Sequence, residues 1–324
     1  MKLQQLRYIR EVARCQLNIS QAADKLFTSQ PGVSQQIRAL EAELGTDIFL
    51  RNGKHLQAIT PTGQRIIEAA EDILTRVENI QKIAGEAQDE EQGSLRIATT
   101  HTQSRYVLPG IIQRFMQRYP RVSLHLHQGT PMQISQLAAD GSVDFAIATE
   151  ALEHFKDLVM LPSFTWNRSI LVPRGHPLAG EIPLTLENIN HFPLITYVFG
   201  FTGRSRLDEA FQRAGLEPNV VVTAADADVI KTYVRAGMGI GIIASLAWEA
   251  ERDSDLIALD ASHLFESSTT SIGFRKGTYL RQYMLEFIRA FAPHLDRERI
   301  DQALQCPDNQ SREALFASVA IPHK

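Results

Sequence analysis

Apolar residues near the start of the chain recur at the spacing of amphipathic helices. The first set is Leu3, Leu6, Ile9 and Val12-Ala13. A second helix is predicted over Ser20–Leu26, with Asn18 or Ser20 as its cap. Its Ala22-Ala23 pair supplies small side chains where two helices pack closely. These two elements predict a compact helical head.

A third helix is predicted from Gln30 to about Leu44. Ser29 is its expected N-cap, Pro31 lies in the first turn, and Gly45 ends it. One face is apolar, and the opposite face carries hydroxyls, amides and one arginine. Such side chains bond base edges and phosphates, although a plain solvent-exposed polar helix has the same composition. The candidate DNA contacts of this region are Thr28, Ser29, Gln30, Pro31, Ser34, Gln35 and Arg38.

A β-hairpin is predicted after the third helix. Its strands are Ile48–Leu50 and Leu56–Ile59, and Asn52-Gly53 is a strong turn signal between them. Arg51, Lys54 and His55 lie around the tip, and Arg51 and Lys54 are candidate phosphate contacts. Residues 1–60 therefore predict an N-terminal, mainly helical winged helix-turn-helix domain.

A connector is predicted over residues 61–92, formed by a long helix and a short acidic linker after it. Apolar residues repeat there at spacings of four and three, as in a heptad seam. They are Ile66, Ala70, Ile73, Val77, Ile80, Ala84 and Ala87. From Pro61 to Gln88 the helix would be roughly 40 Å long at 1.5 Å per residue. The seam favours pairing with a second copy, while packing on the chain's own body is the alternative.

From residue 93 the pattern changes to alternating strands and helices, which indicates a largely parallel α/β sheet. The first series has strands at Leu95–Ala98, Val122–Leu126 and Val143–Ala148. The second has strands at Leu194–Tyr197, Val220–Val222 and Ile240–Ala244. Late segments at Thr270–Phe274 and Tyr279–Phe291 complete the first lobe. Residues 93–324 therefore predict a two-lobed domain.

Two turns in this domain are candidate anion sites. Thr99–Gln103 follows the first strand, and Gly200–Ser205 follows the first strand of the second lobe. Each places hydroxyl and backbone donors at the start of a helix, where anions bind well. Threonine-rich caps also start many helices that bind nothing, so position alone leaves both readings open.

The charge distribution adds to this picture. The 324 residues carry a net charge of −4, but residues 1–60 hold eight basic against five acidic groups. The head is thus +3 and the remainder −7, which suits local contact with phosphates. Two cysteines, no signal-peptide pattern and no membrane-length apolar run predict a cytoplasmic protein with no membrane partner.

Motifs of enzymes and metal sites are weak in this sequence. The glycine run at 237–241 follows a helix and enters a strand, the reverse of a dinucleotide site. His125 and His127 alternate on one predicted strand, but a structural metal site needs about four ligands. We therefore expect no catalytic residues, no metal and no cofactor.

The head resembles the DNA-binding domain of LysR-type transcription regulators. The matching residues are Ala22-Ala23, Leu26, Ser29-Gln30-Pro31, Val33-Ser34, Ile37, Leu40-Glu41, Gly45, Phe49, Arg51, Thr60-Pro61 and Gly63. The resemblance implies promoter DNA and RNA polymerase as partners and a dimer or homotetramer. It also implies an effector domain like the type II periplasmic binding proteins. Its lobe I would span about 93–164 and 268–291, lobe II about 165–267, and a C-terminal extension 292–324.

The body is similar to the members of this family that activate cysteine biosynthesis genes. The similarity is carried by Thr99–Gln103, Trp166–Ser169, Phe199–Ser205 and Ala225–Arg235, among other stretches. It implies an acetylserine inducer and small sulfur anions (sulfate, sulfide or thiosulfate) bound between the lobes. The implied contacts are Thr100, Thr102, Gln103, Trp166 and Thr202, with Thr149 as a further candidate. Alternatives are a LysR-type regulator of sulfonate or other sulfur-starvation genes, and a solute-binding protein that only carries ligand.

Overall fold

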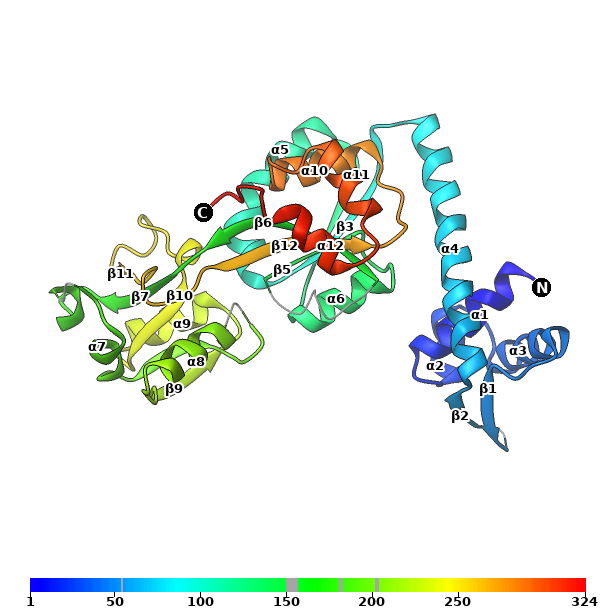
Figure 1. The fold of residues 1–324 in the computed structure, drawn as a ribbon, viewed down its shortest axis with the longest axis horizontal. Helices are drawn as coiled ribbons and strands as arrows, with labels where there is room; N and C mark the ends of the chain where they lie inside the picture. The colour runs from blue at the N-terminus through cyan, green and yellow to red at the C-terminus, as the bar shows by residue number, and fades with distance from the viewer. Residues whose placement is uncertain (54, 150–156, 181–182, 202–203) are drawn as a thin grey trace. The chain divides into compact units, whose positions relative to one another are not determined.

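The computed structural model describes residues 1–53, 55–149, 157–180, 183–201 and 204–324 (Figure 1). The chain divides into two compact units. Unit 1 comprises residues 1–88 and 277–279, and unit 2 comprises residues 89–276 and 280–324.

Unit 1 begins with three helices, α1 (Leu3–Arg14), α2 (Ile19–Lys25) and α3 (Gln30–Leu44). The predicted caps are confirmed, since the side chains of Asn18 and Ser29 accept backbone N–H bonds at the starts of α2 and α3. Gly45 ends α3 in the left-handed conformation. The apolar faces of the three helices meet in one core with the first half of the next long helix.

The predicted hairpin is present as β1 (Phe49–Asn52) paired with β2 (His55–Ile59). Both strands extend one or two residues further toward the turn than the sequence pattern indicates. The buried Glu41 of α3 joins the hairpin to the helices, because its Oε1 accepts from the backbone nitrogens of Ile48 and Phe49 at 2.9 and 3.1 Å. The wing is thus anchored to α3 by one carboxylate.

The connecting helix α4 (Pro61–Gln88) has the predicted length. Its start is held by Thr60, whose hydroxyl accepts from the Gly63 nitrogen and donates to the Asp47 carbonyl, each at 2.8 Å. A Cβ on Gly63 would lie 2.1 Å from the Ile48 carbonyl oxygen, so only glycine fits there. The predicted single seam is wrong at its beginning, because Ala70 is buried in the core of unit 1 and Ile66 packs against that core.

Lobe I of unit 2 is built on a five-stranded sheet with the order β4-β3-β5-β12-β6. The strands are β3 (Gln92–Thr99), β4 (Arg121–Gln128), β5 (Phe145–Ala148), β6 (Leu158–Trp166) and β12 (Ser268–Arg275). Its helices are α5 (Leu108–Arg118), preceded by a turn of π-helix, η1 (Gln103–Val107), then α6 (Pro131–Ala139) and α10 (Gln282–Phe291). Aromatic side chains of β5, β12, α5 and α10 fill its main core.

Lobe II has a second five-stranded sheet with the order β11-β7-β10-β8-β9. The strands are β7 (Arg168–Pro173), β8 (Leu194–Tyr197), β9 (Val220–Ala224), β10 (Ile240–Ala244) and β11 (Leu256–Asp260). The helical elements are α7 (Leu186–Asn190), α8 (Arg204–Arg213) and α9 (Ala227–Arg235), with short 3₁₀ turns η3 (Pro177–Gly180) and η4 (Ser245–Ala247).

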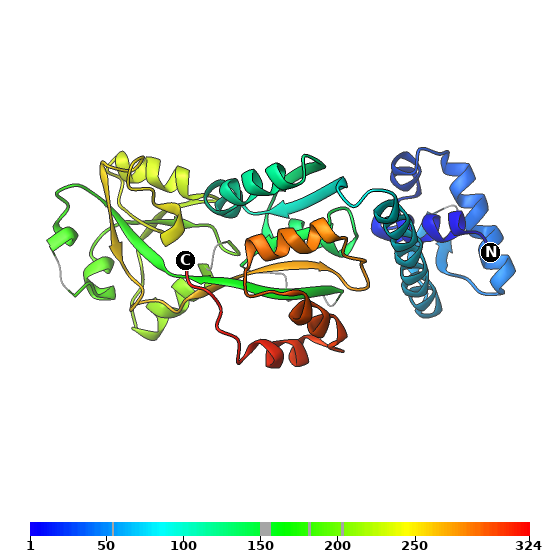
Figure 2. The ribbon, with the colours of Figure 1, turned by 90° about the horizontal axis from the view of Figure 1, so that it is seen from above.

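The chain passes between the lobes twice. Figure 2 shows β6 running on into β7, with only Asn167 between them, and the return passes from β11 to β12. In each sheet one strand, β12 in lobe I and β7 in lobe II, runs opposite to the other four, so two of the four strand pairings are parallel and two are antiparallel. The expectation of a largely parallel sheet is therefore correct for half of the pairings only.

The C-terminal extension folds onto lobe I. It forms α11 (Arg297–Gln305) and α12 (Asn309–Phe316), and both helices pack near β6. Beyond them the chain runs beside β6, where the nitrogen of Thr165 donates to the Pro322 carbonyl at 2.8 Å and the nitrogen of Lys324 donates to the Thr165 carbonyl at 2.9 Å. The extension thus covers the outer edge of the lobe I sheet.

Backbone conformation and close packing explain the glycines at 237, 239 and 241. Gly237 ends α9 with a φ of +75°, and a Cβ on Gly239 would lie 2.3 Å from the Pro193 carbonyl oxygen. A Cβ on Gly241 would press on side chains of α9.

Among the helices that the structure describes, none combines the length and apolarity required to cross a bilayer.

Candidate DNA-binding and effector sites

The outward face of α3 carries the side chains expected to contact DNA. Gln35 and Arg38 are exposed, and Arg38 has no ion pair within the described part of the chain. The Gln30 amide donates to the Ser34 hydroxyl at 3.2 Å, which orders two candidates on the first turn. Ser29 has a structural task, since its hydroxyl accepts from the Gly32 nitrogen at 3.3 Å. Thr28 is half-buried and Pro31 is exposed.

Arg51 differs from Arg38 because it is already paired. Its guanidinium donates to Oε2 of Glu41 at 2.5 Å. Both arginines line an open hollow of about 520 Å³ between the end of α3 and β1. Their positive charges therefore lie on one surface, but only Arg38 is free of the helix–wing anchor. Lys54, the other candidate on the wing, lies outside the described residues.

Phe27 is a surface feature that the sequence pattern did not single out. It lies in the turn between α2 and α3 with a φ of 51°, a conformation rare for a large side chain, and is 98% exposed. Because this aromatic ring is exposed to solvent just before α3, it is available to a binding partner. Its only sequence signal is an aromatic residue inside a tight polar turn.

From residue 73 onward, α4 carries an exposed apolar stripe. Ile73, Ile80 and Ile83 are all large apolar side chains left in contact with water. The first two belong to the predicted seam. An exposed stripe on a long helix is typical of a surface that pairs with another helix.

Three of the predicted effector contacts, Gln103, Thr149 and Trp166, surround Thr270, which the sequence pattern did not single out. The Thr270 hydroxyl of β12 is fully buried and receives the Gln103 amide at 3.2 Å and the Trp166 indole N–H at 3.1 Å. It also lies 3.2 Å from the Thr149 hydroxyl. Since these residues come from four separate segments, only the folded sheet brings them together.

The hydrogen bonds at Thr270 set the direction of the proton at Thr149. A hydroxyl oxygen has two acceptor positions and one proton. Gln103 and Trp166 take both acceptor positions, so the Thr270 proton points to the Thr149 oxygen. The proton of Thr149 is then available to another acceptor. The side-chain carbonyl oxygen of Gln103, Oε1, is buried and has no hydrogen-bond partner within the described chain. The site thus offers one donor and one acceptor.

Lobe II contributes Tyr197 and a buried cation. The Tyr197 hydroxyl accepts from the Ala244 nitrogen at 3.3 Å and is bonded to Thr102 of lobe I. Burial raises the pKa of Tyr197 to about 12, although these two hydrogen bonds act to lower it. The Tyr197 hydroxyl therefore stays protonated and neutral. The guanidinium of buried Arg168 lies 5.4 Å from the centre of the Trp166 ring. A fixed positive charge there favours an anion.

The two remaining effector candidates are Thr100 and Thr202. Thr100 is buried at the start of the η1 segment, and its carbonyl accepts from the Ser104 nitrogen at 3.1 Å. Thr99 has a structural role, since its hydroxyl donates to the Ile147 carbonyl. Thr202 lies outside the described residues. Among the described residues, Arg204 begins α8, and its guanidinium donates to the Tyr197 carbonyl at 2.9 Å.

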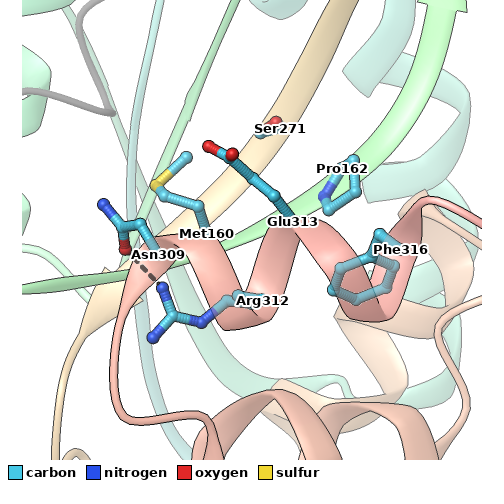
Figure 3. A pocket seen from close by; sticks show the side chains of 7 residues that line it. All are labelled: Met160, Pro162, Ser271, Asn309, Arg312, Glu313 and Phe316. Carbon is cyan, nitrogen blue, oxygen red and sulfur yellow. Dashed lines mark hydrogen bonds between the residues drawn. The ribbon is translucent and has the colours of Figure 1, made fainter.

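A separate cavity of about 190 Å³ lies at the C-terminal extension (Figure 3). Figure 3 shows Asn309 bonded to Arg312 on α12, with Met160, Pro162 and Ser271 on the strands opposite. None of the predicted effector contacts lines this cavity. This cavity is therefore distinct from the effector site around Thr270.

The chain belongs to the LysR family of bacterial transcription regulators. Residues 3–64 match the bacterial regulatory helix-turn-helix of the lysR family, and residues 88–296 match the LysR substrate binding domain. Members of this family bind promoter DNA and small effectors, form oligomers and are not enzymes. The helix-turn-helix rules out a protein that only carries solute.

Curated relatives narrow the class to regulators of the CysB, SsuR and Cbl type. The chain is 51% identical to the regulator CysB of Haemophilus influenzae over 324 residues, which is 100% of both chains. It is 49% identical to SsuR of Burkholderia cenocepacia over 93% of this chain and 97% of that one. It is 46% identical to Cbl of Escherichia coli over 89% and 91%.

Solved structures agree with the fold. The cofactor-binding domain of the Cbl transcriptional regulator is 45% identical, with a TM-score of 0.64, over 66% of this chain and 95% of that one. Full-length OxyR from Pseudomonas aeruginosa is 22% identical, with a TM-score of 0.66, over 90% and 97%. The winged helix-turn-helix and the two-lobed effector domain are thereby confirmed.

Proposed function

We propose that this regulator activates genes of sulfur assimilation and cysteine biosynthesis. The observation that carries the proposal is the 51% identity to a CysB regulator, in an alignment that covers 100% of both chains. The controlling ligands are an acetylserine-type inducer and small sulfur anions such as sulfate or thiosulfate. They bind between the lobes at Thr100, Thr102, Gln103, Thr149, Trp166 and Thr202.

The chemistry around Thr270 supports two kinds of ligand. The free proton of Thr149 and the charge of Arg168 suit an oxyanion or a carboxylate. The unpartnered carbonyl oxygen of Gln103 needs a donor, because a buried acceptor without a partner costs about 1–3 kcal/mol. Sulfate and thiosulfate have no hydrogen to give at neutral pH, whereas acetylserine has a carboxylate together with an O–H or N–H donor. The site therefore distinguishes inducer from anion by a single hydrogen bond.

The proposed mechanism links this cleft to promoter DNA. A dimer or tetramer, paired in part through the exposed stripe of α4, presents several α3 helices to one promoter. The DNA contacts come from the start of α3 and the turn before it, and from Arg51 and Lys54 on the wing. In and before α3 they are Thr28, Ser29, Gln30, Pro31, Ser34, Gln35 and Arg38. Ligand acts only through its different affinity for two arrangements of the lobes. The resulting complex then recruits RNA polymerase.

A regulator of sulfonate or other sulfur-starvation genes is the second candidate. It is favoured by the 49% and 46% identity to SsuR and Cbl. Deletion of the gene in its own host separates the two. The cysteine-gene proposal predicts that the mutant requires cysteine when sulfate is the sulfur source. Growth on sulfate with a defect on sulfonates alone would favour the second candidate.

Calorimetric titration of the full chain tests the effector site. We expect acetylserine, sulfate and thiosulfate to bind the wild type, and Thr270→Val to weaken all three at least tenfold. Thr269→Val is the matched control, because Thr269 is the preceding residue of β12 and makes none of the hydrogen bonds around Thr270. Equal affinities in the two variants would show that the ligands do not bind at the Thr270 cluster.

A further inference from the structure

The turn that carries the predicted effector contacts also reaches across to lobe II. Gln103 donates to Thr270, and Thr100 and Thr102 of the same turn are buried, while three neighbouring side chains of this turn point to α9. They are His101, Arg105 and Tyr106. The π-helical η1 segment makes this possible, since its widened turn displays both sets within seven residues.

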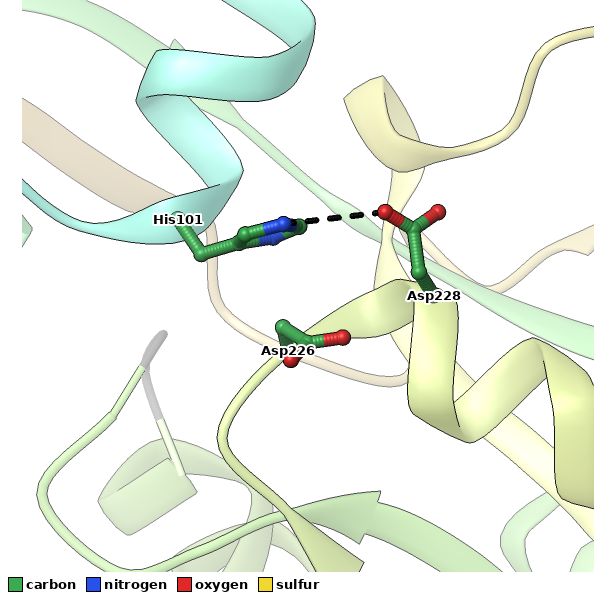
Figure 4. A group of neighbouring side chains, drawn as sticks. All are labelled: His101, Asp226 and Asp228. Carbon is green, nitrogen blue, oxygen red and sulfur yellow. Dashed lines mark ion pairs between the residues drawn. The ribbon is translucent and has the colours of Figure 1, made fainter. Parts of the chain in front are cut away.

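All three side chains converge on Asp228 in the first turn of α9. The Tyr106 hydroxyl donates to Oδ1 of Asp228 at 2.6 Å. Nε2 of His101 lies 3.6 Å from Oδ2, and Nε of Arg105 lies 3.9 Å from it. Figure 4 shows the His101 ring directed at the Asp228 carboxylate, with Asp226 beside it. One carboxylate of lobe II thus interacts with three side chains of lobe I.

The lobe II side of this contact is rigid. Lys231, one turn further along α9, donates to the Tyr106 oxygen at 3.2 Å and to Asp253 at 2.6 Å. Lys231 and Asp253 are both buried, and Asp253 also accepts from Arg235 and from the Glu249 nitrogen. Because a buried pair with all its hydrogen bonds made is costly to disturb, it gives Tyr106 a fixed partner.

A metal ion is the competing explanation of the cluster. Ligand atoms of His101, Asp226 and Asp228 lie within 4.8 Å of one another. Both carboxylates already have protein donors, however, since Asp226 caps α9 through the Val229 nitrogen and Asp228 receives Tyr106. The carboxylates therefore serve the helix start and the lobe contact.

We propose that Asp228 is a positioning residue of the effector site. Through Tyr106, Arg105 and His101 it holds the Thr100–Gln103 turn at a fixed distance from lobe II, so that the anion contacts of both lobes face one ligand. This proposal rests on the proposed function for the identity of the ligand. The lobe contact itself does not depend on that identity.

The test measures lobe separation and ligand binding in the full chain. Spin labels are placed on exposed helix positions by Gln117→Cys on α5 and Gln212→Cys on α8, with Cys306→Ser to remove the accessible native thiol. Labelled chains are diluted into unlabelled ones, so that each assembly holds one label pair. Asp228→Asn and Tyr106→Phe remove the cross-lobe charge and hydroxyl. Asp255→Asn is the matched control, because Asp255 pairs with Arg235 inside lobe II.

We expect Asp228→Asn and Tyr106→Phe to widen the distance distribution and to weaken thiosulfate binding about tenfold, the effect of one charge-assisted hydrogen bond. Asp255→Asn should keep the wild-type distances and affinity, and all variants should keep the wild-type melting temperature within a few degrees. Wild-type distances and affinity in both test variants would overturn the proposal. If the wild type binds neither thiosulfate nor acetylserine, the proposed effector is wrong, and the distances alone decide the role of Asp228.

Discussion

The anchor between α3 and the wing gives a prediction whose size follows from the geometry. Oε1 of Glu41 accepts from the Ile48 and Phe49 nitrogens, and Oε2 accepts from Arg51. Glu41→Gln keeps an oxygen for the two amides and loses only the charge-assisted bond to Arg51. We expect this loss to cost about 2 kcal/mol. Glu41→Ala also leaves two buried N–H groups without an acceptor, so its cost should be about 5 kcal/mol.

Hydrogen exchange of the peptide that contains Ile48 and Phe49 measures both costs in the full chain. A loss of about 2 kcal/mol corresponds to roughly a 30-fold fall in protection, and the alanine variant should fall by at least ten times more. Glu43→Gln is the control, because Glu43 is an exposed neighbour on α3 whose only ion pair among the described residues is with the amino terminus. Equal losses in the glutamine and alanine variants would refute the claim that one carboxylate oxygen caps both amides.

Three further predictions concern the head and lobe II. Arg38→Ala should weaken promoter binding about tenfold in a fluorescence anisotropy titration and leave the melting temperature unchanged, since exposed Arg38 supports no other described residue; a lowered melting temperature would contradict this. Gly63→Ala should destabilise the head by about 1–3 kcal/mol in urea unfolding, because the new methyl group meets the Ile48 carbonyl, and wild-type stability would exclude that contact. Burial disfavours the charged form of Asp253, but hydrogen bonds led by Lys231 outweigh it and lower its pKa. The folded pKa is thus below the unfolded one, so this carboxylate stabilises the fold above about pH 4 and stops doing so as the pH falls further. Asp253→Asn should therefore show a flatter loss of stability on acidification than the wild type, and identical slopes would contradict it.

Elements with local signals were predicted well from the sequence. The caps of α2 and α3, Gly45 and the hairpin turn each depend on residues within a few positions of one another. The crossing strand β6 was missed, because Pro162 interrupts a run that is buried on most positions and shows no alternation. The α4 seam was only partly correct, since a heptad pattern does not reveal which part of a stripe the chain's own core covers.

The effector site shows a different limit. Thr100, Thr102 and Gln103 follow a strand, but that position alone left their role open, and the family resemblance made them candidates. Thr270 was missed, because its partners are more than 100 residues away along the chain and meet it only through strand pairing. Tyr197 was predicted as part of a strand, and its bond to Thr102 depends on how the two lobes face each other.

The most direct test of the account is DNA binding by the full chain as a function of ligand. A footprint on the upstream region of a cysteine biosynthesis gene is titrated with acetylserine, in its N- and O-acetyl forms, and with thiosulfate. We expect acetylserine to change the protected length or the affinity, thiosulfate to oppose that change, and Thr102→Val to bind the DNA without responding to either. An unchanged footprint and affinity at saturating acetylserine in the wild type would contradict the account.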